Sequence, residues 1–90
     1  MTTQALTAAL VIAQYGATNK VKITISHCIG LSHVVVAAIT SAQASKSDPV
    51  LAATDAITGF AAAQEFTLTH EQATNLATAI VNTPDAAGSL

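Results

Sequence analysis

Apolar residues recur every three or four positions in the first fifteen residues, which is the period of a helix. A glycine, Gly16, follows this segment directly. Glycine commonly ends helices because it adopts the left-handed conformation without a steric penalty. The pattern therefore predicts a first helix over residues 3–15, with apolar positions Leu6, Ala9, Leu10 and Ala13.

A strict alternation follows over residues 21–26, where β-branched aliphatic residues take every second position and Lys22, Thr24 and Ser26 take the others. A period of two is typical of a strand with one buried and one solvated face. Residues 65–69 alternate again over a shorter stretch. We therefore expect a strand at 21–26, which could pair with 65–69 in a minimal two-stranded sheet.

The stretch from His27 to Ser47 has two interpretations. One apolar set has complete helical spacing and predicts a helix over residues 30–45, with the face Leu31, Val34, Val35, Ala38, Ile39 and Ala42. Three consecutive valines at 34–36 instead favour a second strand, which would follow a turn at 28–32 and form a hairpin. The helix is favoured because its pattern continues through the alanines beyond residue 40.

Two further helices have clear start signals. Asp48 followed by Pro49 combines an N-cap oxygen with a proline at the first helical position, and predicts a helix to about Gln64. Thr69 and Gln72 have the spacing of a capping box, and Thr83-Pro84-Asp85 ends the helix that follows. The expected inner faces are Val50, Ala53, Ile57, Phe60 and Ala61 in one helix and Ala73, Leu76, Ala77, Ile80 and Val81 in the other.

These elements predict a mainly α fold: a small bundle of three or four short, alanine-rich helices, with at most the minimal β element formed by 21–26 and 65–69. The class is therefore α or α+β. A chain of 90 residues has room for a single domain. We expect this domain to span residues 1–82 and to be followed by a C-terminal tail over 83–90.

Composition changes the picture at the surface. Hydrophobic residues make up 51% of the chain, but aromatic residues only 3% and charged residues only 9%, against about a quarter charged in an ordinary soluble domain. Three lysines, no arginine and a net charge of −2 exclude the basic footprint of a nucleic-acid-binding protein. A surface with so few charges does little to keep neighbouring copies apart.

Residues capable of chemistry are few and badly spaced. Cys28 is the only strong nucleophile, and neither His27 beside it nor His33 five residues on has the spacing of a nucleophile and its base. Neither those residues nor His70 belongs to a metal-binding motif, and the scattered glycines form no phosphate loop. We expect no catalytic residue, no metal and no cofactor, so the protein is not expected to be an enzyme.

Targeting signals are equally sparse. The first fifteen residues lack the positive segment that opens a signal peptide. The nearest candidate for a membrane span, residues 23–39, is interrupted by two histidines, two serines and a glycine. We expect no membrane span and a cytoplasmic or virion location.

Low charge, a thin core and surplus aliphatic residues together indicate a structural subunit that assembles with its own copies or with a larger shell protein, for example a viral minor capsid or cement protein. Ile29 and Val36 lie outside the predicted face of their helix, and the few aromatic residues are candidate anchors. The expected interface residues are Tyr15, Ile29, Val36, Phe60, Phe66 and Leu90. The alternative is a small intracellular adaptor that binds a partner helix in an alanine-lined groove.

Overall fold

The structure, a computed structural model, describes residues 3–64 and 68–83. These two ranges contain four helices and no strand: α1 (Thr3–Asn19), α2 (Ile25–Ala44), α3 (Pro49–Ala63) and α4 (His70–Val81). The prediction of a mainly α fold built from short helices is confirmed. The expected tail lies outside the described residues from position 84 onward, and so does most of the segment 65–69.

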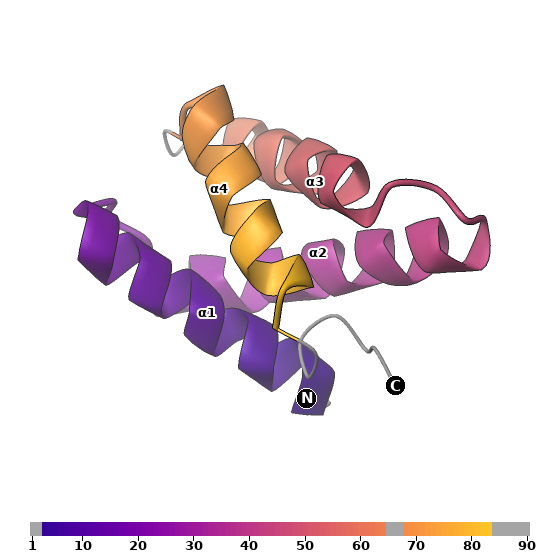
Figure 1. Cartoon of the computed structure of the whole chain (residues 1–90). Coiled ribbons are helices and arrows are strands. Elements are labelled where there is room, and N and C mark those ends of the chain that lie inside the picture. The colour runs from indigo at the N-terminus through magenta and orange to yellow at the C-terminus, as the bar shows by residue number, and fades with distance from the viewer. Residues whose placement is uncertain (1–2, 65–67, 84–90) are drawn as a thin grey trace.

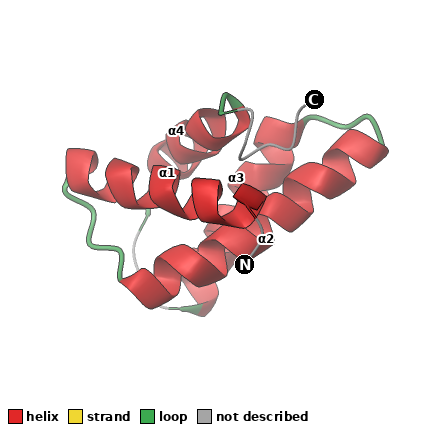
Figure 2. Ribbon diagram, turned by 90° about the horizontal axis from the view of Figure 1, so that it is seen from below, coloured by secondary structure: helices red, strands yellow, loops and turns green. Residues whose placement is uncertain are grey.

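The helices pack around one shared core (Figure 1). α2 contacts α1 and α3, while α4 lies across the bundle and contacts α3 and α1. Short loops join α1 to α2 and α2 to α3 (Figure 2). α1 and α3 lie on opposite sides of the bundle, and α2 and α4 each contact both of them.

The core is aliphatic and contains few large side chains. Small residues such as Ala8, Ala53 and Ala77 are fully buried between the helices. Complete burial of a large aliphatic side chain stabilises a fold by about 1.5–3 kcal/mol, whereas alanine contributes much less. The stability of the bundle therefore depends on a short set of fully buried large residues: Ile12, Leu31, Val35, Ile39, Ile57, Leu76 and Ile80.

The predicted starts of α3 and α4 are confirmed. The carboxylate of Asp48 accepts a hydrogen bond from the backbone N–H of Val50 at 2.9 Å, and Pro49 occupies the first helical position. At α4, Gln72 N–H donates to the Thr69 hydroxyl at 3.0 Å, and Thr69 N–H donates to the Gln72 side chain at 2.9 Å. Both devices satisfy backbone donors that a helix start leaves without an intrahelical partner.

The predicted strand at 21–26 is wrong. Residues 21–24 form an irregular connection, and α2 already begins at Ile25. The alternation is nevertheless physically meaningful, because Val21 and Ile23 are half-buried while Lys22 and Thr24 are exposed. Thr24 acts as the N-cap of α2 and accepts a hydrogen bond from the N–H of His27 at 3.2 Å. A capped helix start thus replaces the second half of the expected strand.

The predicted end of the first helix at Gly16 is also wrong. α1 continues to Asn19, and the left-handed residue is Lys20, with φ of 57°. The N–H of Val21 donates to the carbonyl of Gly16 at 2.9 Å, which closes a Schellman motif around Lys20. Gly16 is buried inside the helix, and a Cβ there would lie 3.0 Å from the Val21 carbonyl and 3.3 Å from the Ile23 side chain. Because glycine has no side chain, Val21 and Ile23 can pack closely against the last turns of α1.

α2 corrects the expectation for residues 27–47 in two ways. It begins five residues earlier than predicted, and the hairpin alternative is excluded because 25–44 is one continuous helix. Its buried face is Cys28, Leu31, Ser32, Val35, Ile39 and Ala42, while Val34, placed on the face by its spacing, is 37% exposed. The Ser32 hydroxyl donates to the carbonyl of Ile29 at 2.7 Å, so a polar side chain is accommodated on the buried face.

Candidate functional site

Helix α1 has a second apolar face that points away from the core. Its buried residues are Ala5, Ala8, Ile12 and Gly16. The leucines from which the helix was predicted lie elsewhere: Leu6 is 52% exposed and Leu10 is 60% exposed. Ala13 and Ala17 are also exposed and continue the same stripe, because positions 6, 10, 13 and 17 lie on one side of a helix.

Helix α2 carries a matching stripe along one edge. Ile25 is 80% exposed and Ile29 is 40% exposed, while Val36 is half-buried and packs against the core. The spacing of four and eleven residues places all three along one line of the helix.

The neighbours of α2 show which edge carries this stripe. Phe60 of α3 covers the opposite edge: a Cβ on Gly30 would lie 2.8 Å from its ring, and His27 meets the same ring edge-on with centroids 6.2 Å apart. α1 must therefore lie on the edge of Val36 and Ile29. The stripe of α2 borders the seam between α1 and α2.

The neighbours of α1 indicate that its stripe also borders the seam between α1 and α2. The phenol of Tyr15 is hydrogen-bonded to the side chain of Asn75, which places this side of α1 against α4. Leu6 and Ala13 lie on the other side of the buried face, next to α2. The two stripes thus form one surface across the seam, which we call the α1–α2 face: Leu6, Leu10, Ala13, Ala17, Ile25, Ile29 and Val36.

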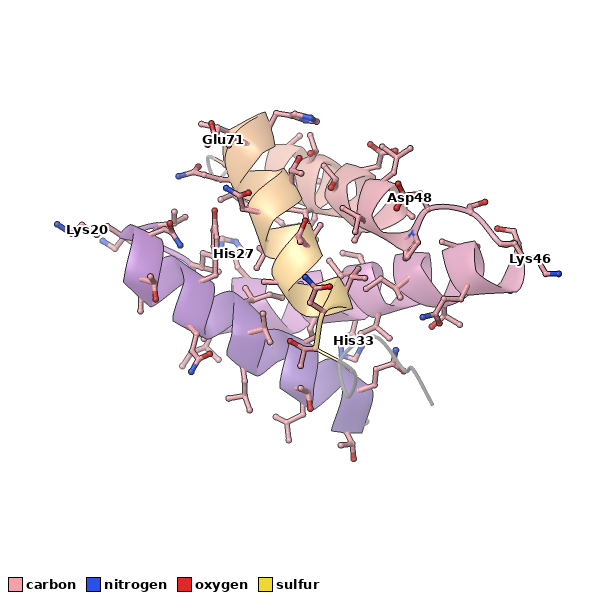
Figure 3. The ribbon with its side chains drawn as sticks, viewed as in Figure 1. Lys20, His27, His33, Lys46, Asp48 and Glu71 are labelled. Atoms are coloured by element: carbon pink, nitrogen blue, oxygen red, sulfur yellow. The ribbon has the colours of Figure 1, made fainter. Side chains whose placement is uncertain are left out.

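The α1–α2 face is almost free of charge. Neither α1 nor α2 contains an aspartate, glutamate, lysine or arginine. Exposed Lys20 and Lys22 lie in the connection at one end of the two helices, and His33 is an exposed titratable side chain on α2. In Figure 3 Lys20, Lys46, Asp48 and Glu71 all lie toward the periphery of the bundle. The face is therefore aliphatic in its centre and basic at one end.

The residues expected at an interface take different places. Ile29 and Val36 both lie in the α1–α2 face, where Ile29 is exposed and Val36 is half-buried. Tyr15 and Phe60 are half-buried and pack against the core of their own chain. Phe66 and Leu90 lie outside the described residues. Sequence reasoning missed Leu6, Leu10 and Ile25, although a signal existed: apolar residues occur on more than one side of the first helix.

The side chains considered for catalysis or metal binding lie in different environments. Cys28 is buried and its thiol has a raised pKa because burial disfavours the thiolate. His27 is half-buried beside Phe60. His33 is exposed on α2 (Figure 3), and His70 is exposed at the start of α4. The described residues contain no group of three potential metal ligands and no pocket.

Length and composition would allow α2 to cross a membrane, since it has 20 residues and no charged side chain. The central helix of a water-soluble bundle satisfies the same criteria. In this structure, six of its residues are buried against the other helices: Cys28, Leu31, Ser32, Val35, Ile39 and Ala42.

Comparisons of the chain with protein-family models, with curated proteins and with solved structures gave no match.

Proposed function

We propose that this protein is a non-enzymatic structural subunit that assembles with copies of itself or with a larger shell protein through the α1–α2 face. The observation that supports this most directly is the exposure of Leu6, Leu10 and Ile25 on a surface without charged side chains. Contiguous apolar surface of this kind typically marks a protein contact.

The rest of the molecule supports the same function. A core with few large side chains leaves the free subunit with modest stability, which contacts with a partner would raise. Lysines at only one end of the face leave its centre free of the desolvation cost that buried charges impose. Threonines on the outer helix surfaces return their hydroxyl hydrogen bonds to the preceding turn, as Thr7 does to the Thr3 carbonyl at 2.9 Å. Such groups can be covered by a partner without losing their hydrogen bonds.

The experiment is sedimentation of the tagged chain from its native source, compared with two variants. Leu6→Gln/Leu10→Gln places amides on the α1–α2 face, and Leu51→Gln changes an equally exposed leucine on α3 as the matched control. We expect the wild type and the control to sediment in a larger assembly and the double variant to be released from it. A wild-type chain that is a heat-stable monomer and retains no partner from its native source would overturn the proposed function.

A further inference from the structure

We propose that the α1–α2 face binds a second copy of this chain, with α1 antiparallel to α1 of the second copy around a two-fold axis. This inference rests on the proposed function and specifies its first contact. The axis passes between Leu10 and Ala13, so that each copy presents the same surface to the other. Closed two-fold dimers of this kind are the commonest form of self-association.

The order of large and small residues along α1 supports the antiparallel arrangement. The leucines of the stripe, Leu6 and Leu10, occupy its first half, and the alanines, Ala13 and Ala17, occupy its second half. Antiparallel pairing around this axis sets Leu6 opposite Ala17 of the second copy and Leu10 opposite Ala13 of the second copy. Large side chains then meet small ones, which permits close packing of two helices. Parallel pairing would set leucine against leucine and leave a gap between the alanines.

The charges favour this orientation over the parallel one. Lys20 and Lys22 lie together at one end of the face. An antiparallel dimer keeps the two lysine pairs at opposite ends of α1, whose 17 residues span about 26 Å at 1.5 Å per residue. This separation exceeds the Debye length of about 8–10 Å at physiological salt, so the repulsion is screened. A parallel dimer would bring four lysines together.

The available area limits the affinity of the dimer. The molecule measures 31 × 23 × 20 Å, so the α1–α2 face extends over less than about 700 Å². Standard interfaces bury about 800 Å² per partner, which is more than this face supplies. We expect a dimer of moderate affinity, with a Kd in the range of about 10–500 μM, because association costs offset much of the aliphatic burial.

The test is a swap of large and small residues measured by sedimentation equilibrium. Leu10→Ala pairs two alanines, and Ala13→Leu pairs two leucines, so each single variant is expected to weaken the wild-type dimer by about tenfold. The double variant Leu10→Ala/Ala13→Leu restores a large–small pair only in the antiparallel arrangement, and its Kd should return to within about threefold of the wild type. Leu51→Ala, at an exposed leucine of α3 outside the face, should leave the Kd unchanged.

Each outcome of these measurements either supports or contradicts the antiparallel dimer. A wild-type chain that stays monomeric up to about 1 mM overturns this inference, while sedimentation from the native source still decides the proposed function separately. Additive weakening in the double variant contradicts the antiparallel pairing. Equal weakening by Leu51→Ala contradicts the choice of face. Circular dichroism of every variant verifies that the helices are retained, as is expected because Leu10, Ala13 and Leu51 are all exposed.

Discussion

At the scale of single residues, the tightest constraint lies where α2 meets α3. The ring of Phe60 rests over Gly30, and the His27 ring approaches its edge, with an angle of 87° between the two planes. No side chain larger than hydrogen fits at Gly30 without movement of the phenylalanine. Gly59, on α3, is surrounded by open space instead, and nothing lies within 4 Å of a Cβ placed there. A side chain is therefore excluded by Phe60 at Gly30 but has room at Gly59.

Replacement of these glycines by alanine should change stability in opposite directions. Gly30→Ala should lower the free energy of unfolding by about 1–3 kcal/mol, because the new methyl group overpacks the contact with Phe60. Gly59→Ala should raise it by about 0.5–1 kcal/mol, because alanine loses less conformational entropy than glycine inside a helix. Urea denaturation measures both effects. Stabilisation by Gly30→Ala would show that Phe60 does not occupy this position.

Two titratable groups with raised pKa values, Cys28 and Tyr15, predict how stability changes with pH. Burial raises the pKa of the Cys28 thiol and of the Tyr15 phenol; at Tyr15 the hydrogen bond with Asn75 opposes this effect and the charge of Glu71 adds to it. A raised pKa in the folded state contributes stability that is fully present below the unfolded pKa, about 8.5 for cysteine. At higher pH the unfolded chain releases the proton first, so the free energy of unfolding should fall.

Urea denaturation at pH 7 and at pH values above about 9 tests this expectation. The decrease should become smaller in Cys28→Ala, because only the contribution of Tyr15 remains. A free energy of unfolding that rises over this range in the wild type would contradict the raised pKa values of Cys28 and Tyr15.

At the scale of elements, the first two helices end in the same unusual way. Lys46 follows α2 with φ of 57°, as Lys20 follows α1. The N–H of Ser47 donates to the carbonyl of Ala42 at 2.7 Å and closes a second Schellman motif. Left-handed backbone is unfavourable for a residue with a Cβ, so glycine is the usual choice at this position. Two strained lysines therefore mark sites where the sequence is not optimised for stability.

Lys20→Gly and Lys46→Gly should each raise the free energy of unfolding by about 0.5–1 kcal/mol, because glycine removes the steric penalty at positive φ. Lys22→Gly is the matched control: it removes the same charge from the same loop, but at a residue without positive φ, and should give no gain. Thermal and urea denaturation report the difference. Equal effects of Lys20→Gly and Lys22→Gly would attribute the change to charge rather than to backbone conformation.

At the scale of the whole molecule, the bundle decides which side of α1 is inside. Ile12 is fully buried between the other helices, while Leu10, two residues earlier, is 60% exposed. Both residues are large and aliphatic, and both belong to helically spaced apolar sets. Their energetic roles differ only because α2 and α4 cover one side of α1 and leave the other uncovered.

This difference is measurable in the monomer. Ile12→Val removes a single methyl group but should cost about 0.5–1.5 kcal/mol, because the space it leaves in the core is not refilled. Leu10→Ala removes three carbon atoms and should change the free energy of unfolding by no more than about 0.5 kcal/mol. Both variants are compared by urea denaturation at low protein concentration, so that self-association does not contribute. A larger loss for Leu10→Ala would mean that the assigned faces are reversed.

Much of the local structure could be read from the sequence because its signals are local. Asp48-Pro49 and the pair Thr69 and Gln72 marked the starts of α3 and α4 through hydrogen bonds that span only two or three residues. The helical class followed from apolar spacing over whole segments. The candidate site was predicted only in part: Ile29 and Val36 were recognised as surplus aliphatic residues, whereas Leu6, Leu10 and Ile25 were assigned to the first helix or to the expected strand.

By itself, the sequence determined that this chain forms alanine-rich helices, where two of them begin, and that its surface carries few charges. Only the tertiary structure decided which apolar residues are buried, because a helix with aliphatic residues on two sides satisfies the same spacing in either orientation. Packing also decided the conformation of residues 21–24. Val21 and Ile23 pack against the bundle from an irregular connection that ends at Thr24, the N-cap of α2. Burial depends on neighbours distant in the chain, and those neighbours determined the exposed face on which the proposed assembly depends.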